Sequence, residues 1–310
     1  MKNITLRQIR IFLSAAHYLN FSNTAKALHI TSPAVSLQMK EMENDIGVKL
    51  FNRDNKKISL TSAGEYFLVY SKRIVNTLHE AELIMGTLQG TAFSTLKIGL
   101  VSTAQHFLPH LLAAFKADYP TVQIRIEVRN RQQLIQLLKE GDIDVAIMGR
   151  PPKEINNDLA PIAIHPHGFV ASPQHPLALQ SKVSATTLNT CELISREQGS
   201  GTRFIMEKFL SEHNISPLIS MEMSSNETIK LAVTANLGIS FMSLHTVAEE
   251  IRTKKIIVLE IEDTPVIRAW HVVSLNNRLT SAMAKQFQHF MQNRGGDIIT
   301  QFGSNTTQIA

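Results

Sequence analysis

The sequence predicts an α/β protein in three parts: a small, mainly α N-terminal module, a long linker helix, and a two-lobed α/β region. Three observations predict this fold. Apolar residues recur at helical spacing within residues 1–62, an apolar stripe with a seven-residue repeat follows in residues 64–90, and short apolar strands alternate with helices from residue 95. At 310 residues and 44% hydrophobic content, the chain is long enough for two or three domains with buried cores.

The N-terminal module is predicted to contain three short helices within residues 1–62. The third begins after a tight turn, with Thr31 or Ser32 as N-cap and Pro33 in the first turn, where its missing N–H is not needed. It ends at Gly47, because glycine readily adopts the left-handed conformation that closes a helix. Apolar residues form its inward face: Val35, Met39, Met42 and Ile46.

The outward face of the third helix carries Ser36, Gln38 and Lys40. Short polar side chains near a helix N-terminus can reach base edges and phosphates in the major groove. Helix, tight turn and capped helix form a helix-turn-helix, and residues 50–64 (LFNRDNKKISLTSAG) predict a two-stranded wing after it. The residues expected to contact double-stranded DNA are Thr31, Ser32, Pro33, Ser36, Gln38, Lys40, Arg53, Lys56, Lys57 and Thr61.

The net charge of +5 is concentrated in the N-terminal module. Residues 1–62 hold nine basic and four acidic side chains, whereas the remaining residues carry 22 of each sign. A basic module on a neutral body indicates a polyanionic partner for the module alone. The alternative from charge alone is a solvated, slightly basic surface.

The linker helix, residues 63–90, has an apolar stripe that needs a partner. That partner is either the body of the same chain or the same helix of a second copy. The stripe consists of Phe67, Ile74, Ala81 and Leu88, with Leu78 and Met85 four residues after two of them.

The α/β region is expected to form two subdomains with a cleft between them. Residues 95–165 and 266–293 make the first and residues 166–265 the second, because the strand at 269–275 fits only if the chain crosses back near 263–268. The polar tail, residues 294–310, is expected to be disordered.

Three polar segments are expected at the cleft. Residues 196–203 (REQGSGTR) place a glycine-rich loop before a helix, where free N–H groups favour an anion. Taken alone, this loop is more often an ordinary helix cap, and only the convergence of three polar segments favours a binding site. Ser102-Thr103 follow the first strand, and Gly149-Arg150-Pro151 follow the third. The candidate ligand-binding residues here are Ser102, Thr103, Arg150, Gly199, Ser200, Gly201, Thr202 and Arg203.

Residues 25–53 match the pattern A-x-x-L-x-x-S/T-x-P-A-x-S-x-Q-x-x-x-x-E-x-x-x-G-x-x-L-F-x-R. The chain therefore resembles the LysR-type transcriptional regulators, from residue 1 to about 293. One departure is Ser32, where that family more often has Gln. The resemblance implies a periplasmic-binding-protein-like effector domain, a linker helix that dimerises, and a homodimer or homotetramer that binds operator DNA and can contact RNA polymerase.

Four segments of the α/β region narrow the resemblance: STAQHFLPHLL, IDVAIMGRPP, REQGSGTR and SNETIKLAVTANLGIS. They are similar to the branch containing CbbR and CmpR, regulators of carbon-fixation and inorganic-carbon operons. Regulators of this branch respond to phosphorylated sugars, nucleotides or related acids. This resemblance adds Glu227 to the expected cleft residues.

Other classes of protein fit less well. An enzyme could use Ser195, His165, His167 or Asp144, but G-x-S-x-G, Walker A, H-E-x-x-H and Rossmann motifs are all missing. A metal at His165-x-His167 is a weak alternative to a structural role, so no metal or cofactor is expected. A periplasmic solute-binding protein would need a signal peptide and would not carry residues 1–62, and a nucleoid-type structural protein would lack the cleft.

The expected location is the cytoplasm, because no signal peptide or apolar run of membrane-spanning length is found and Cys191 is the single cysteine. The sequence therefore predicts a LysR-type DNA-binding transcription regulator, not an enzyme. A small, anionic, phosphorylated metabolite is expected to modulate it, with a carbon-fixation or central-metabolism operon as target. The alternative is a regulator of amino-acid, aromatic or sulfur metabolism with a non-phosphorylated carboxylate effector.

Overall fold

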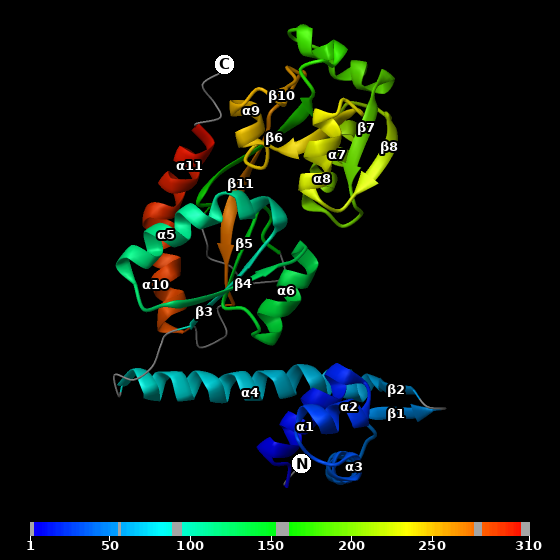
Figure 1. Cartoon of the computed structure of the whole chain (residues 1–310), viewed down its shortest axis with the longest axis vertical. Helices are drawn as coiled ribbons and strands as arrows, with labels where there is room; N and C mark the ends of the chain where they lie inside the picture. The colour runs from blue at the N-terminus through cyan, green and yellow to red at the C-terminus, as the bar shows by residue number, and fades with distance from the viewer. Residues whose placement is uncertain (1–2, 55–56, 89–94, 153–160, 276–280, 305–310) are drawn as a thin grey trace. The chain divides into compact units, whose positions relative to one another are not determined.

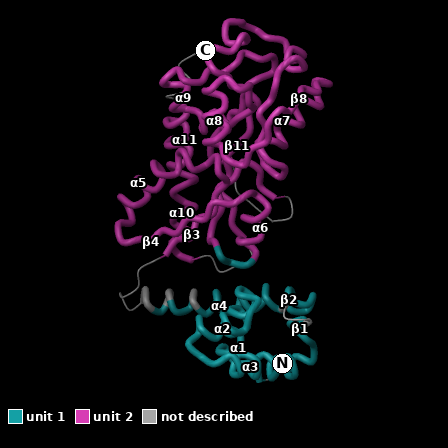
Figure 2. Tube along the Cα trace, turned by 45° about the vertical axis from the view of Figure 1, so that its right-hand side comes forward, with its two compact units in different colours: residues 1–93, 140–142 teal, residues 94–139, 143–310 magenta. Residues whose placement is uncertain are grey.

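The computed structural model describes residues 3–54, 57–88, 95–152, 161–275 and 281–304. The chain divides into two compact units, residues 1–93 with 140–142 and residues 94–139 with 143–310 (Figure 2). Unit 1 is mainly helical, and unit 2 is built on one large sheet (Figure 1).

Unit 1 contains the predicted helix-turn-helix, wing and long helix. Its elements are α1 (Leu6–Tyr18), α2 (Phe21–Ala27), α3 (Ser32–Ile46), β1 (Phe51–Asp54), β2 (Lys57–Leu60) and α4 (Ser62–Leu88). The strands β1 and β2 pair antiparallel from Phe51 opposite Leu60 to Asp54 opposite Lys57. Phe12 of α1 lies at the centre of the core, with ring centroids 5.5 Å from Phe51 and 5.0 Å from Phe67 of α4.

Unit 2 is organised around a nine-stranded sheet with the order β4-β3-β5-β11-β6-β9-β7-β8, in which β10 pairs with β6. The pairs within each half of the sheet, β3 with β4 and β5, and β7 with β8 and β9, are parallel as predicted. The strands are β3 (Thr95–Leu100), β4 (Gln123–Val128), β5 (Val145–Met148), β6 (Ala163–Ala171), β7 (Glu192–Arg196), β8 (Leu218–Met223), β9 (Ile239–Ser243), β10 (Ile257–Val258) and β11 (Val266–Val273).

The helices of unit 2 alternate with these strands. They are α5 (Leu108–Asp118), α6 (Arg131–Glu140), α7 (Gly201–Glu212), α8 (Asn226–Thr234), α9 (Ala248–Arg252), α10 (Ala282–Phe290) and α11 (Gly296–Ser304). Short 3₁₀ helices occupy Ser102–His106, Pro176–Leu179 and Ala185–Thr190, and a π-helical turn, Met291–Gly295, joins α10 to α11.

The two crossings of the chain lie on β6 and β11, which run antiparallel through the middle of the sheet. β11 pairs with β6 over Val266–Trp270 and with β5 over His271–Val273, so the chain returns to the first half of the sheet as predicted.

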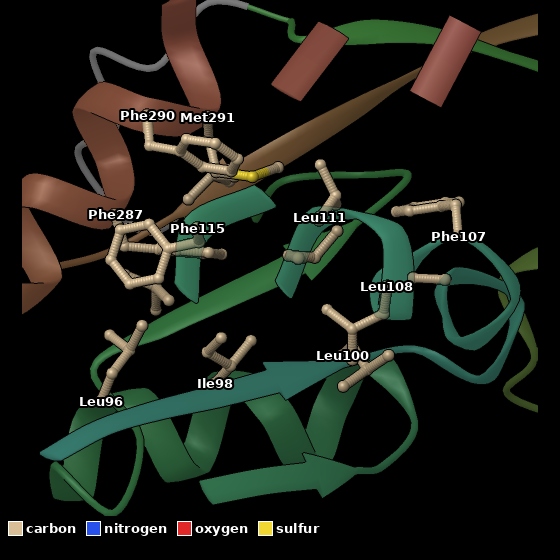
Figure 3. Close-up of a cluster of buried hydrophobic side chains, with 14 of the residues drawn as sticks. Leu96, Ile98, Leu100, Phe107, Leu108, Leu111, Phe115, Phe287, Phe290 and Met291 are labelled. Carbon is tan, nitrogen blue, oxygen red and sulfur yellow. The ribbon is translucent and has the colours of Figure 1, made fainter. Parts of the chain in front are cut away.

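The buried apolar side chains of unit 2 lie in separate cores on the two sides of this crossing. One core combines residues 96–147 with 270–299, and another draws only on residues 169–261. Phe115 of α5 packs edge-on against Phe287 of α10 in the first core, with ring centroids 5.1 Å apart (Figure 3). This grouping supports the division into two subdomains.

The expectation of a disordered tail from residue 294 is wrong for residues 294–304. These residues complete the π-helical turn and form α11, in which Ile299 is fully buried and Ile298 and Phe302 pack against the first core. Gly296 allows the close approach, because a Cβ there would lie 2.3 Å from the carbonyl oxygen of Ile162. The remaining tail, residues 305–310, lies outside the described residues.

Candidate functional site

The helix α3 begins as the sequence predicts. Thr31 is its N-cap and accepts a hydrogen bond from the Ala34 amide at 3.4 Å, and Gly47 closes it with a φ of +86°. Val35, Met39 and Met42 are buried, and Ile46 is half-buried. The cap fixes the first turn of the helix, from which the polar side chains project.

The polar face of α3 is accessible. Lys40 is exposed, whereas Ser36 and Gln38 are half-buried. The Gln38 amide nitrogen donates to Glu41 Oε2 at 2.9 Å, an exposed contact that can open when a base edge competes for the amide. Of the residues that precede them, Ser32 is half-buried and Pro33 is exposed.

Two residues of the predicted DNA-binding set also have structural roles. Thr61 donates to the Lys49 carbonyl at 2.7 Å and accepts from the Gly64 amide at 3.0 Å, so its hydroxyl is occupied at the start of α4. Arg53 is paired with Glu43 at 3.2 Å, and its guanidinium lies 5.3 Å from the ring centroid of Phe21. Contacts within unit 1 therefore hold Thr61 and Arg53 in place, and neither residue needs a DNA phosphate as a partner.

Glu43 belongs to the pattern of residues 25–53, but its structural role in unit 1 was not predicted from the sequence. Its side chain is buried, and Oε1 accepts hydrogen bonds from the amides of Leu50 at 2.9 Å and Phe51 at 3.1 Å. Its Oε2 pairs with Lys49 at 3.3 Å and with Arg53. One carboxylate therefore ties α3 to the first strand of the wing.

The remaining wing residues of the DNA-binding set are only partly described. Lys56 lies outside the described residues, and for Lys57 the backbone in β2 is described but the side chain is not. Their contacts with phosphates stay a prediction.

Unit 2 contains a cavity of about 510 Å³ bounded by the ends of β3, β5 and β7 and by the crossing strands. All but one of the predicted cleft residues line it: Ser102, Thr103, Arg150, Gly199, Ser200, Gly201, Thr202 and Arg203. Gly199 has a φ of +88°, a conformation that favours glycine, and the next residue, Ser200, is the N-cap of α7 with its amide donating to the carbonyl of Glu197 at 3.2 Å. The prediction that three separate polar loops meet at one cavity is confirmed.

Glu227 is the exception and does not line the cavity. Its carboxylate, 64% exposed, pairs with Lys230 at 2.9 Å on the same helix. The preceding residue, Asn226, is buried instead, and its amide nitrogen donates to Ser102 Oγ at 3.2 Å. The expectation that Glu227 lines the cavity is therefore wrong, and Asn226 is not among the lining residues either.

Arg203 lines the cavity, but carboxylates already balance its charge. Its Nε donates to Glu207 Oε1 at 2.7 Å, and Nη1 contacts Glu222 and donates to the carbonyl of Arg196 at 3.1 Å. The hydrogen bonds that Arg203 donates to Glu207 and to Glu222 raise the pKa of Arg203. The geometry therefore does not support Arg203 as the main holder of a ligand's charge.

Arg196, which the sequence analysis did not select, lies deeper in the same cavity and is only 6% exposed. Its Nε and Nη2 donate to the two oxygens of Glu197 at 2.7 and 2.9 Å. Its Nη1 contacts Asn226 and lies 3.5 Å from Ser102 Oγ. Arg196 thus connects the end of β7 with α8 and with the end of β3.

The electrostatic character of the cavity is strongly positive. Its lining includes six arginines, Arg129, Arg131, Arg150, Arg196, Arg203 and Arg268, but only two carboxylates, Glu197 and Glu207. Arg150 lies over the ring of Phe204, 4.3 Å from its centroid. In the part of the chain that the structure describes, neither Arg150 nor Arg268 is paired with a carboxylate. Such a lining favours an anionic ligand.

A cluster of buried histidines borders the cavity on the crossing strand β6. The ring of His165 stacks on Trp270, with centroids 3.7 Å apart, and lies 4.0 Å from the ring of His167. Trp270 donates from Nε1 to Nδ1 of His245 at 3.2 Å. Among the described residues, no group of three or more His, Cys, Asp or Glu side chains has the geometry to hold a metal.

These histidines predict an acid-sensitive fold. Burial lowers the pKa of His167 to about 3 and that of His245 to about 4, from 6.5. Below pH 6.5 the unfolded chain therefore binds protons that the folded chain does not. We expect the free energy of unfolding of unit 2 to fall with pH in this range, by up to about 1.4 kcal/mol per pH unit for each histidine. Urea unfolding of wild type and His167→Phe between about pH 7 and pH 5 tests this, since the variant should show the shallower slope. Equal slopes would contradict it.

A helix-turn-helix joined to a two-lobed domain with a polar cavity defines a ligand-responsive transcription regulator. Two family models match the chain: the bacterial regulatory helix-turn-helix protein of the lysR family over residues 6–65, and the LysR substrate binding domain over residues 89–296. The chain belongs to the LysR family of transcription regulators and is not an enzyme. No helix among the described residues is long and apolar enough to span a membrane.

Three relatives place the chain within this family. It is 39% identical to the HTH-type transcriptional regulator CfxR of Cupriavidus necator, over 94% of this chain and 92% of CfxR. It is 35% identical to the RuBisCO operon transcriptional regulator of Allochromatium vinosum, over 93% and 96% of the two chains. The regulatory domain of Synechocystis CcmR, solved with 2-PG, is 29% identical with a TM-score of 0.61, over 70% of this chain and 99% of that domain.

Proposed function

We propose that this regulator controls a carbon-fixation or central-metabolism operon and that a small phosphorylated metabolite modulates its action on operator DNA. The observation that carries the proposal is the cavity of unit 2, with six arginines against two glutamates beside the glycine-rich loop at the start of α7. Two relatives support it, one named as a regulator of the RuBisCO operon and one solved with 2-PG, the phosphorylated acid 2-phosphoglycolate. A regulator that binds chromosomal DNA in a bacterium acts in the cytoplasm.

Arg196 is proposed to bind the phosphate together with the loop before α7. It is buried and lines the cavity, where a single carboxylate, that of Glu197, pairs with its Nε and Nη2, and its Nη1 lies beside the hydroxyl of Ser102. Helix N-terminal amides and a guanidinium both favour a phosphate, and each charge-assisted contact is worth about 1.5–3 kcal/mol. Arg203 then stabilises the loop through its contact with the Arg196 carbonyl.

Calorimetric titration of the full chain with sugar phosphates, nucleotides, 2-phosphoglycolate and non-phosphorylated carboxylates tests the effector class. We expect a phosphorylated compound to bind most tightly and to change the footprint on operator DNA. Tightest binding of an amino acid or aromatic carboxylate would favour the alternative, a regulator of amino-acid, aromatic or sulfur metabolism.

The DNA interface is proposed to be the polar face of α3 with the wing. Gln38→Ala should lower the ratio of specific to non-specific binding, because the amide is placed to read a base edge. Lys40→Ala is the matched variant on the same helix, and it should weaken binding to operator and scrambled DNA about equally and reduce the salt slope by about one. Gel-shift titrations at two salt concentrations measure both. Equal losses on the two DNAs for Gln38→Ala would reject the base-reading role.

The linker helix α4 is proposed to form the interface of a homodimer, from which a tetramer can be assembled. Tyr66, Tyr70 and Ile74 lie four residues apart and are 73%, 58% and 44% exposed, and Met85 is also exposed. Phe67, which the sequence analysis assigned to this stripe, packs against Phe12 inside unit 1 instead. For Leu88 the side chain lies outside the described residues.

The double variant Ile74→Asp, Leu78→Asp is expected to dissociate this dimer. Two carboxylates would enter an apolar interface, where an unpaired charge costs several kcal/mol or must take up a proton. Multi-angle light scattering gives the mass of wild type, of this variant, and of Ile74→Leu, Leu78→Met, which keeps the stripe apolar and should remain a dimer. An unchanged mass for the aspartate variant would show that α4 does not hold the copies together.

A further inference from the structure

One apolar side chain lies in the middle of the polar face of α3. Leu37 is 55% exposed, and among the described residues it is not part of the apolar core of unit 1. At about 100° per residue, its direction differs by about 160° from the directions of Val35 and Met39, which are fully buried in that core. Leu37 therefore points almost directly away from the core.

The neighbours of Leu37 on the helix surface are residues that we expect to contact DNA. Ser36 and Gln38 lie about 100° to either side of it, and both are half-buried. Pro33 and Lys40, about one turn before and after it, are exposed. When this face enters a major groove, Leu37 is the residue that points most directly at the base edges, with Ser36 and Gln38 on its two sides.

The major groove of unmodified DNA offers a leucine one apolar partner. Every base edge there presents hydrogen-bond donors or acceptors, and thymine alone adds a C5-methyl group. A leucine placed against any other base removes water from polar atoms without replacing their hydrogen bonds, which costs free energy. Contact with the thymine methyl group instead removes apolar surface from water on both sides. An apolar side chain at this position therefore selects for thymine.

We propose that Leu37 is a specificity-determining residue that reads a thymine methyl group in the operator. The LysR pattern in residues 25–53 leaves position 37 unspecified, so this preference belongs to the chain and not to the motif. The nine basic against four acidic side chains of residues 1–62 favour DNA as the partner of this face. The inference rests on the proposed DNA interface of α3 and adds the base that the centre of this face prefers.

The test removes the methyl group and the leucine separately. The full-length protein first selects operator DNA from a random pool, and each thymine is then replaced in turn by deoxyuridine, which lacks only the C5-methyl group. Gel-shift titrations give the affinity of wild type and of Leu37→Ala for each duplex. At a thymine that faces Leu37, deoxyuridine should weaken wild type about fourfold, since a buried methylene is worth about 0.8 kcal/mol and about 1.4 kcal/mol is a factor of ten. Leu37→Ala should bind the two duplexes equally.

Leu37→Met and Val48→Ala are the matched controls. Methionine keeps an apolar side chain at the same position, so the preference for thymine over deoxyuridine should persist. Val48 is 48% exposed and follows the C-cap of α3, so its replacement removes an exposed apolar side chain beyond the end of the helix. This variant should keep the deoxyuridine profile of wild type. Leu37→Ala should keep the salt slope of wild type, because no phosphate contact is lost.

The outcomes separate this inference from the proposed interface. A wild type that binds thymine and deoxyuridine equally at every position, or a preference that survives in Leu37→Ala, would overturn the methyl contact. A lower mass of Leu37→Ala in light scattering would also overturn it, because the leucine would then contact a second copy. In each case a loss of specificity in Gln38→Ala leaves the interface on α3 standing. If neither Gln38→Ala nor Leu37→Ala changes the sequence preference, the interface itself fails and the methyl contact with it.

Discussion

Glu43→Ala is expected to destabilise unit 1 by about 2–5 kcal/mol and to abolish operator binding. The carboxylate accepts from the amides of Leu50 and Phe51, and these amides have no replacement partner when it is removed. A buried amide that loses its partner costs about 1–3 kcal/mol, and Lys49 and Arg53 lose their ion pairs at the same time. Since a whole domain is stable by only about 5–15 kcal/mol, much of this margin would be lost.

A graded series of variants measures this effect. Glu43→Gln keeps one acceptor oxygen for the amides and should be destabilised less than Glu43→Ala. Glu41→Ala, at an exposed position of the same helix, should stay within about 0.5 kcal/mol of wild type. Urea unfolding gives the stabilities, and gel shifts with operator DNA give the binding. If Glu43→Ala unfolds like wild type, the buried carboxylate does not hold the wing to α3.

The local signals in the sequence determined the elements of unit 1 almost completely. Thr31, Pro33 and Gly47 set the two ends of α3, because capping chemistry depends only on neighbouring residues. The role of Glu43 needed the tertiary structure, since its partners lie six to ten residues further along the chain. Acidic residues on helices are usually exposed, so its residue type alone gave no indication of burial.

The loops that line the cavity could be predicted from the sequence, but the ion pairs among the side chains inside it could not. Alternation of strands and helices brought the segments at 102, 149 and 199 to one place. Which arginine remains available for a ligand depends on the carboxylates that the fold brings near it. Two carboxylates, those of Glu207 and Glu222, pair with Arg203, whereas Glu197 alone pairs with Arg196.

The helix α11 was missed because its signal is short. Its apolar residues, Ile298, Ile299 and Phe302, occupy one and a half turns between glycines and polar residues, a composition typical of a free tail. Gly296 permits close packing against the carbonyl of Ile162. The sequence alone does not distinguish a glycine in a flexible segment from a glycine that allows close packing.

Arg196→Met is expected to weaken binding of the phosphorylated effector by about a hundredfold. The change removes the most buried cation of the cavity together with its contacts to Asn226 and Ser102, which join the end of β7 to α8 and β3. A charge-assisted hydrogen bond is worth up to about 3 kcal/mol, and 1.4 kcal/mol corresponds to a factor of ten. Operator binding without effector should stay near wild type, because α3 and the wing belong to unit 1.

Two further variants show whether effector binding depends on the positive charge of Arg196 or on the geometry of its guanidinium. Arg196→Lys keeps the positive charge but lacks the planar fork that donates to both oxygens of Glu197, so we expect an intermediate loss. Arg203→Met should lose less than tenfold, because two carboxylates, those of Glu207 and Glu222, balance that guanidinium, whereas Glu197 alone pairs with Arg196. Calorimetry with the best phosphorylated ligand, beside thermal unfolding to confirm an intact unit 2, ranks the three variants. A larger loss for Arg203→Met than for Arg196→Met would show that the phosphate binds at Arg203 and the glycine-rich loop. The ligand would then have to displace Glu207 and Glu222 from Arg203.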